Sequence, residues 1–225
     1  MKLYMHPVSM TSRPVRLFVA EERIPVEEVV VDLMQGEHYQ PAFAAVNPSR
    51  QVPVLEEDDG FRLSESSAIL KYLAEKAGSQ AYPRELRPRA RVNEMMDWLN
   101  TGFYREYGYG LFYPQIFPNH KRPSETAQQA CLEWAKERAA AWLRILDEHW
   151  IGPRNAYLGG DRLTLADYFG SGFVSLGELC GMDFARYPNV KRWLDNMEAL
   201  PSWSRVNEVF YGFRDALKGQ AFVTV

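Results

Sequence analysis

Hydroxyl groups gather in a short loop that follows the first apolar run of the chain. The apolar run ends at His6-Pro7, and the next residues carry hydroxyls at Ser9, Thr11 and Ser12. A serine hydroxyl is too weak a base to remove a proton at neutral pH, but it can donate a hydrogen bond to an anion. The loop therefore predicts a site that stabilises a negative charge.

A second polar stretch surrounds a predicted β-hairpin. Two short strands, at 54–55 and 61–63, are separated by Asp58-Asp59-Gly60, whose residues tolerate turn conformations. Pro53 cannot donate to a strand ladder, so it marks an edge strand, a bulge or a cis turn. The backbone of Val52 is then free to form strand-like hydrogen bonds with a peptide-like ligand.

The hairpin leads into a helix whose first turn is polar. Glu65 and Ser66 precede an apolar helical pattern from Ala68 to Leu73. The first N–H groups of a helix have no partner within it and favour an anion. We expect Ser66 to receive a carboxylate and Glu65 to hold an ammonium group. The alternative is a surface hairpin followed by an ordinary capped helix.

The elements that position these groups follow one order. A strand at 3–5, a helix that Thr11 or Ser12 caps, a strand from Glu27 to Asp32, a short helix at 40–46, the hairpin and its helix give β-α-β-α-β-β-α. The β-branched residues of 29–31 predict a buried parallel strand. This is the order of thioredoxin-like domains, but the loop after the first strand has no cysteine, which excludes disulfide exchange.

The chain changes character after residue 78. Residues 79–88 have the composition of a linker, and 89–225 show helical periodicity throughout. We therefore expect a thioredoxin-like domain at 1–78 and an all-α domain at 89–225. In the second domain, Thr164 and Asp167 form a helix cap without chemistry. Of the seven aromatic residues between 103 and 117, we expect most to be core or interface and some to line an apolar ligand site, with these candidates: Tyr104, Tyr107 and Phe112.

Composition excludes several classes of protein. The net charge of −3 lacks the basic excess of a nucleic-acid-binding surface, and no stretch suits a secretory signal or a membrane span. Cys131 and Cys180 show no zinc or disulfide spacing, and the four histidines show no metal-binding pattern. We expect a cytoplasmic protein without a metal, nucleic-acid or membrane partner.

Three motifs together resemble the cytosolic glutathione transferase family along nearly the whole chain. They are Q-V-P-V-L from Gln51, S-E-S-S-A-I-L-K-Y-L from Ser64, and L-T-L-A-D ending at Asp167. Within the family, L-Y-M-H-P-V-S-M-T-S-R-P-V and V-D-L-M-Q-G-E-H are similar to the theta class and its bacterial relatives, including glutathione-dependent dehalogenases. The resemblance implies a homodimer and glutathione as cosubstrate.

The same resemblance assigns roles residue by residue. Ser9 matches the serine that contacts the glutathione sulfur. The positions that match the rest of the glutathione site are His38 near the glycine carboxylate, Gln51 and Val52 along the glycine and cysteine portions, Pro53 in cis, and Glu65 and Ser66 at the γ-glutamyl end. Two positions depart from the pattern. Thr11 stands where the theta class usually has proline, and Asn93 where some members place an aspartate that reaches across the dimer.

The implied chemistry is activation of a thiol. A free thiol titrates at about 8.5, so only about 3% is thiolate at pH 7. A charge-assisted hydrogen bond of about 1.5–3 kcal/mol lowers that pKa by one or two units. We expect the thiolate to attack a small electrophile, by addition or by displacement of halide. Ser12 and Tyr4 are rivals of Ser9 for the sulfur contact.

Two other functions fit the same sequence. One is a dehalogenase or isomerase specialised on one substrate. The other is a binding protein of the same fold without turnover, which would recruit a protein partner through its helical half.

Overall fold

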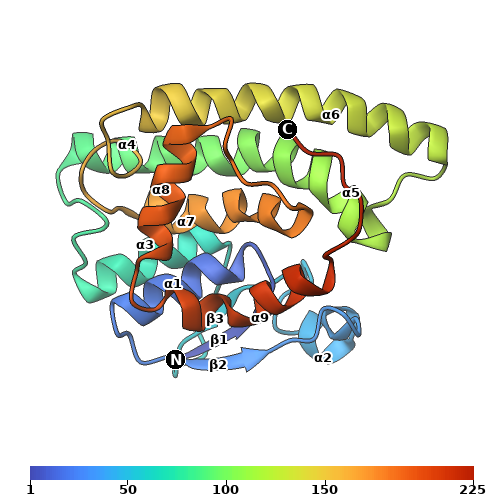
Figure 1. Ribbon diagram of the computed structural model, residues 1–225. Coiled ribbons are helices and arrows are strands. Elements are labelled where there is room, and N and C mark those ends of the chain that lie inside the picture. The colour runs from blue at the N-terminus through green and yellow to red at the C-terminus, as the bar shows by residue number, and fades with distance from the viewer.

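The N-terminal half forms a four-stranded sheet with helices packed on it. In the computed structural model, which describes residues 1–225, the elements are β1 (Lys2–Met5), α1 (Ser12–Glu21), β2 (Glu27–Val30), α2 (Pro41–Ala44), β3 (Val54–Glu56), β4 (Arg62–Ser64) and α3 (Ser66–Ala77). The strand order is β2-β1-β3-β4, with β1 parallel to β2 and the other two pairs antiparallel. This confirms the thioredoxin-like order, and Figure 1 shows the sheet at the opposite side from α6.

One strand differs from its prediction. The run Val29-Val30-Val31 predicts a strand covered on both faces, but β2 is an edge strand and Val30 is 55% exposed. Val31 is buried, although it lies just beyond the end of β2. An edge strand pairs on one side only and can leave its valines in water. The prediction of a buried strand was therefore wrong.

The second half is helical. Its elements are α4 (Leu86–Asp97), π-helical segments at Trp98–Phe103 and Arg105–Phe112, α5 (Tyr113–Ile116), α6 (Glu125–Ile145), a π-helical segment at Leu146–Ile151, α7 (Leu165–Val174), a 3₁₀ segment at Ser175–Cys180, α8 (Pro188–Glu198) and α9 (Trp203–Ala216). Short 3₁₀ turns lie at Glu37–Tyr39 and Pro118–His120. Helix α4 begins three residues before residue 89, the predicted start of the helical domain, and Ala81 and Tyr82 within the predicted linker are buried.

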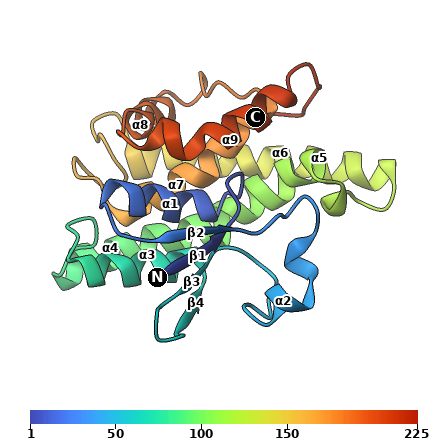
Figure 2. The same cartoon turned by 90° about the horizontal axis from the view of Figure 1, so that it is seen from below.

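The two halves meet where α1 packs on α7 and α9. Figure 2 shows α1 between the sheet and these two helices. Gly172 on α7 makes the close approach possible, because a Cβ there would lie 2.5 Å from Pro14 Cγ and 2.8 Å from Met10 carbonyl oxygen. The loop that carries Ser9 is thus held against the helical half. No helix is long and apolar enough to cross a membrane.

Candidate active site

Sheet topology brings the predicted site residues to one edge. Strand β1 and strand β2 both end there, and β3 begins there because it is antiparallel to β1. The register pairs Val54 with Ser64, so Val52, two residues before Val54, approaches the start of α3, where Ser66 lies. The Ser9 loop follows the end of β1 at the same edge. Residues that are far apart in sequence therefore surround one surface.

Ser9 is held in the loop by its own backbone. Its N–H donates to the carbonyl of His6 at 3.0 Å, and its carbonyl accepts the N–H of Arg13 at 3.0 Å. The side chain is partly exposed, and its Oγ accepts the N–H of Ser12 at 3.2 Å. Ser9, rather than Thr11 or Ser12, thus supplies the side-chain acceptor at the start of α1. The positive end of that helix dipole lies beside its hydroxyl.

Ser12 is less accessible than Ser9. It is fully buried, and its Oγ accepts the N–H of His6 at 3.5 Å. The other rival, Tyr4, lies within β1 and packs edge-on against Phe43, with ring centroids 6.2 Å apart. A ligand on the surface meets Ser9 in preference to Ser12.

Val52 presents backbone groups beside Ser9. The Val52-Pro53 peptide bond is cis. The N–H of Val52 donates no hydrogen bond within the chain, and its carbonyl accepts only the hydroxyl of Thr11, at 2.9 Å. Thr11 Oγ1 is also 3.0 Å from Ser9 Oγ. The structure therefore joins Ser9, Thr11 and Val52 in one hydrogen-bonded set.

The start of α3 is open. No side chain caps it, so the first-turn N–H groups of Ser66, Ser67 and Ala68 have no partner. Glu65, just before the helix, has φ = 67° and an exposed side chain. A positive φ is unfavourable for a residue other than glycine. This geometry aims the free N–H groups and the Glu65 carboxylate outward, as a ligand with a carboxylate and an ammonium group requires.

His38 and Gln51 lie in the loops next to this edge. His38 lies in the 3₁₀ turn Glu37–Tyr39, between β2 and α2. Burial lowers the pKa of the His38 imidazole, and its Nδ1 is buried without a partner. Gln51 is exposed, and its carbonyl accepts the side-chain amide of Asn47 at 2.8 Å. The Gln51 side chain is left free for a ligand.

Arg13 is a buried cation that is not among the site residues predicted from the sequence. Its guanidinium donates to Asn207 Oδ1 at 2.6 Å and to Ser175 Oγ at 3.0 Å, and it lies 3.6 Å from the centre of the Phe210 ring. Burial lowers the pKa of this group to about 10, so it stays charged at neutral pH. The signal in the sequence was a basic residue inside the apolar face of α1. Arg13 ties α1 to the helical half directly beneath the Ser9 loop.

The predicted apolar ligand site needs correction. Tyr107 and Phe112 have no exposed surface, and Tyr104 is 4% exposed. Tyr107 donates its hydroxyl to the carbonyl of Val174 at 2.8 Å, and Tyr104 stacks on Phe173 with centroids 4.0 Å apart. All three rings are packed in the core, so in this structure they offer no surface for a ligand.

Another group of rings is accessible beside them. Tyr109 is 42% exposed, and its ring lies 4.9 Å from Tyr113 and 5.6 Å from His120. Phe117 stacks on Phe213 of α9. Burial raises the pKa of Tyr109, and the negative charge of Glu65 acts in the same direction.

Thr164 and Asp167 close the start of α7, as the sequence predicts. One carboxylate oxygen of Asp167 accepts the N–H and the hydroxyl of Thr164, at 2.7 and 2.9 Å. The other accepts the N–H of Leu158 at 2.6 Å and the indole N–H of Trp193 at 2.9 Å. Burial raises the pKa of Asp167 to about 6, so it is ionised at neutral pH with four donors around it. The pair fastens α7 to α8.

Asn93, one of the two departures from the family pattern, has a hydrogen-bond partner within the chain. Asn93 on α4 uses its side-chain oxygen to accept the hydroxyl of Tyr82 at 3.1 Å. No group of three or more His, Cys, Asp or Glu side chains is placed to hold a metal ion.

Comparison with known proteins matches both halves of the chain. Residues 1–75 match the glutathione S-transferase N-terminal domain, and residues 111–201 match the C-terminal domain of the same family. Glutathione S-transferase theta-1 of Mus musculus is 32% identical over 211 residues, which are 88% of this chain and 82% of the relative. The Homo sapiens protein of the same name is 32% identical over 208 residues, with the same coverage.

Comparison with solved structures points to the same family. The apo form of human glutathione-S-transferase T1-1 has a TM-score of 0.78 at 30% identity, over 95% of this chain and 90% of that one. Human glutathione transferase theta-2, in complex with glutathione and an unknown ligand, has a TM-score of 0.83 at 26% identity, over 99% and 92%. By sequence and by fold, this chain belongs to the glutathione S-transferase family and is similar to its theta members.

Proposed function

We propose that this chain activates glutathione through Ser9 and transfers it to a small hydrophobic electrophile. Membership of the family gives the reaction class, which is that of a transferase. The observation that carries the proposal for this chain is the set of polar groups gathered at one sheet edge. They are the Val52 N–H, the first-turn N–H groups of α3 and the partly exposed Ser9 hydroxyl.

These groups fit the parts of a γ-glutamyl tripeptide. The α3 start and Ser66 receive the γ-glutamyl carboxylate, and Glu65 receives its ammonium group. Val52 pairs with the cysteine portion as a neighbouring strand would. Gln51 and His38 lie toward the glycine end. Pro53 acts only by setting the direction of the chain at Val52.

Ser9 would act as a donor and not as a base. Its hydroxyl favours the thiolate over the thiol, and the positive end of α1 and the buried charge of Arg13 act in the same direction. Bound glutathione supplies the nucleophilic sulfur. The thiol proton leaves to solvent. A sulfur–carbon bond forms while halide departs with its electron pair, or while an activated double bond takes up the pair and then a proton.

The electrophile would lie against the accessible rings instead of the buried ones. Tyr109, Phe117 and His120 replace Tyr104, Tyr107 and Phe112 as the surface offered to it. The negative charge of Glu65 acts on the pKa of Tyr109, which supports a place for the electrophile near the glutathione site. His120 adds a polar group whose pKa is lowered by burial, so it is neutral at pH 7.

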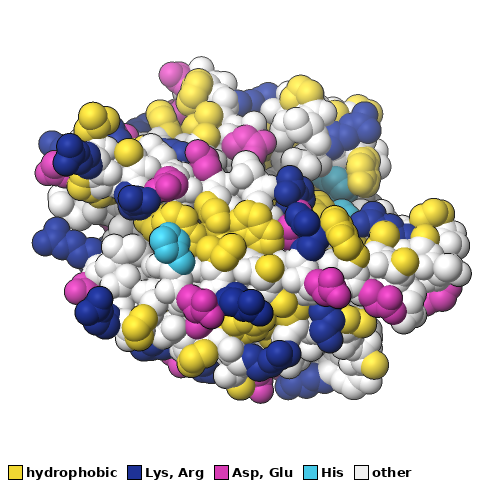
Figure 3. Space-filling view, turned by 90° about the horizontal axis from the view of Figure 1, so that it is seen from above, with side chains coloured by type: hydrophobic (Ala, Val, Ile, Leu, Met, Phe, Trp, Pro, Cys, Tyr) yellow, Lys and Arg dark blue, Asp and Glu magenta, His cyan; other side chains and the backbone are white.

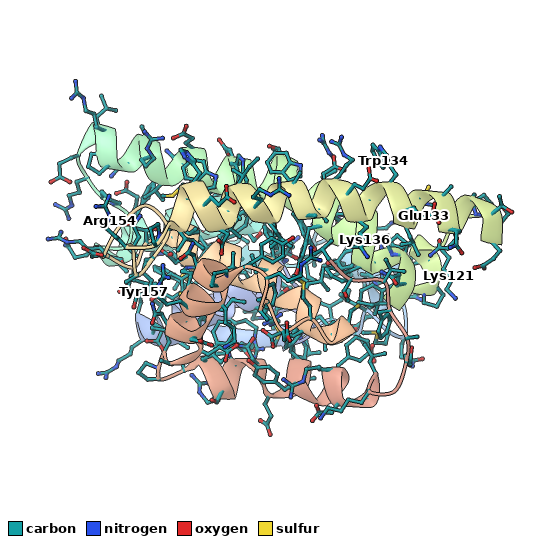
Figure 4. The ribbon with its side chains drawn as sticks, turned by 45° about the horizontal axis from the view of Figure 1, so that its top comes forward. Lys121, Glu133, Trp134, Lys136, Arg154 and Tyr157 are labelled. Carbon is teal, nitrogen blue, oxygen red and sulfur yellow. The ribbon has the colours of Figure 1, made fainter.

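A homodimer would use the face of α4 and α6. Figure 3 shows a band of hydrophobic side chains on the face over α6, flanked by charged ones. Trp134 on α6 is 59% exposed, and Arg138 stacks on its ring at 4.7 Å. Figure 4 shows Trp134 projecting away from the body of the protein. Sedimentation equilibrium should give twice the chain mass, and a monomer at micromolar concentration would contradict the proposal.

We also propose that the protein is located in the cytoplasm.

Binding and turnover together test the function. We expect the protein to be retained on immobilised glutathione and to conjugate glutathione with an activated aryl halide. Ser9→Ala should keep the retention and lower turnover about 10- to 100-fold, because one charge-assisted hydrogen bond is lost. Thr101→Ala, at an exposed position of the π-helical segment Trp98–Phe103, is a matched control. Turnover by Ser9→Ala at the rate of the unmodified protein would contradict the role of Ser9.

The competing functions give different results. Turnover of a single halide or a single isomerisable substrate, with none of a broad electrophile panel, would identify a specialised dehalogenase or isomerase. Retention on glutathione without turnover of any electrophile would identify a binding protein.

A further inference from the structure

Thr11 connects the two groups that the proposed function depends on. Its hydroxyl donates to the carbonyl of Val52 at 2.9 Å, and the same oxygen lies 3.0 Å from Ser9 Oγ. A hydroxyl has one proton, and that of Thr11 is committed to Val52. Ser9 must therefore be the donor in the bond between the two side chains. The hydrogen bonds run from Ser9 to Thr11 to Val52.

In this arrangement Ser9 does not aim its proton at a ligand. Its single O–H points to Thr11, and one of its lone pairs already accepts the N–H of Ser12 at 3.2 Å. Ser9 can donate to a ligand sulfur only after it gives up its bond to Thr11. The free protein thus holds its activating hydroxyl in a resting direction.

The Val52 carbonyl, which accepts the hydroxyl of Thr11, is also placed to accept a hydrogen bond from a ligand. A peptide that pairs with Val52 as a strand would donate its own N–H to that carbonyl. The neighbouring Val52 N–H has no partner in the chain and would donate in return. The carbonyl oxygen has two lone pairs, and a ligand N–H that takes the one used by Thr11 displaces that hydroxyl.

We infer that Thr11 is a positioning residue that makes the Ser9 hydroxyl turn toward the ligand sulfur when a ligand N–H takes the Val52 carbonyl. This inference rests on the proposed function. Once displaced from Val52, the Thr11 proton turns to Ser9 Oγ, and the Ser9 proton turns to the sulfur. Only two O–H groups rotate about their C–O bonds. No covalent bond to the protein forms or breaks, and the thiol proton leaves to solvent.

Reversal of the hydrogen bond between Ser9 and Thr11 makes the Ser9 hydroxyl a stronger donor. Ser9 Oγ then accepts from both the Ser12 N–H and the Thr11 hydroxyl while it donates to sulfur, which satisfies all its hydrogen-bonding capacity. A hydroxyl that accepts hydrogen bonds is a stronger donor, by about 10–30% for each bond. Proline, the usual theta-class residue at position 11, has no hydroxyl. The linked rotation of the Ser9 and Thr11 hydroxyls therefore depends on the threonine that this chain has at position 11.

Thr11→Val tests the inference, because valine keeps the shape and removes the hydroxyl. The readout is the ultraviolet absorbance of the thiolate in the protein–glutathione complex, titrated with pH in the absence of any electrophile. We expect the pKa of the bound thiol to rise by about 0.3–0.7 units in Thr11→Val, from the loss of one cooperative bond. Thr11→Ser should restore the original value. An unchanged or lowered pKa in Thr11→Val would overturn the inference.

Two controls separate positioning from a loss of structure. S-Methylglutathione has no thiol, so its affinity should stay within about two-fold in Thr11→Val if the loop is intact. A large loss of that affinity would assign Thr11 a purely structural role and overturn the inference. In a Ser9→Ala background, Thr11→Val should cause no further shift in the thiol pKa, because Thr11 acts through Ser9. An equal shift in both backgrounds would also overturn it.

The same titration separates this inference from the proposed function. If the unmodified protein leaves the glutathione thiol at its free pKa, the proposed function fails. If the unmodified protein lowers the pKa and Thr11→Val lowers it equally, only the role of Thr11 fails.

Discussion

Helices α3 and α7 begin in similar sequences, but side chains close the start of α7 and leave the start of α3 open. Both starts combine a hydroxyl with an acidic residue, Ser66 with Glu65 and Thr164 with Asp167. At α7 the carboxylate turns inward and accepts four hydrogen bonds. At α3 no side chain caps the helix, and Glu65 adopts φ = 67° with its carboxylate exposed. A satisfied helix start stabilises the fold, whereas an open one is available for a ligand.

The position of the acid explains the difference. Asp167 is the third residue of its helix, so it can fold back to the N–H of Thr164. Glu65 is the N-cap residue of α3, where the short side chains of Ser, Thr, Asp or Asn commonly accept the first-turn N–H groups, but its longer side chain is exposed and makes no such bond. Four substitutions test whether this contrast between fold and binding holds.

The largest effect should come from substitution of Asp167, the residue whose carboxylate closes the start of α7. Asp167→Ala leaves the N–H groups of Leu158 and Thr164 and the indole of Trp193 without an acceptor. Buried unpaired donors of this kind cost about 3–5 kcal/mol in total. Urea unfolding should show that loss in the free energy of unfolding. A loss below 1 kcal/mol would mean that α7 does not depend on its closed start.

A half-buried carboxylate without such donors, Glu178, should respond differently to pH. Burial raises the pKa of Glu178 to about 7; nearby Glu198 acts in the same direction, and Arg13, Arg214 and Lys191 oppose it. Because the folded pKa exceeds the unfolded value of about 4.5, Glu178 adds stability below pH 4.5 and loses it as pH rises through 7. Relative to Glu178→Gln, the unmodified protein should lose up to about 3 kcal/mol between pH 4.5 and pH 8. Parallel stability curves for the two proteins would contradict this.

At the open start, substitution should affect binding and leave the fold intact. Ser66→Ala removes a hydroxyl that has no hydrogen-bond partner in the chain. Calorimetry should show glutathione affinity lowered about ten-fold, which corresponds to about 1.4 kcal/mol. The free energy of unfolding should change by less than about 0.5 kcal/mol. Equal losses of binding and stability would remove the contrast with α7.

The smallest effect should appear at Glu65 itself. Glu65→Gly removes the unfavourable positive φ of a side chain and also removes the carboxylate. Chemical denaturation should show stability unchanged or raised by up to about 1 kcal/mol, while glutathione binding falls. Glu65→Gln keeps the length of the side chain and the backbone cost but removes the charge, and serves as the control. A destabilised Glu65→Gly protein with normal affinity would reverse the assignment.

Sequence was sufficient where local rules decide the structure. The turn at Asp58-Asp59-Gly60, the polar start of α3 and the cap at Thr164 each depend on residues within a few positions. The order of elements in the first 77 residues followed from their spacing. The roles of individual site residues came from the family resemblance, and the structure adds the contacts among Ser9, Thr11 and Val52.

Sequence was insufficient where distant packing decides. The place of β2 at the sheet edge depends on which strands pair, and a run of valines does not encode that. Tyr107 and Phe112 lie in a π-helical segment, where the wider turn changes which residues share a face. The sequence shows that aromatic residues cluster between 103 and 117, but not which of them face the core. Arg13 finds its partners on α9 and on the 3₁₀ segment after α7, more than 150 residues away in sequence.

A pH titration of the glutathione thiol in complex with the protein shows whether Ser9 stabilises the thiolate. We expect a thiol pKa one to two units below the free value of about 8.5, and a return toward that value in Ser9→Ala. A bound thiol that titrates at its free value, or one whose lowered pKa survives Ser9→Ala, would contradict this role of Ser9.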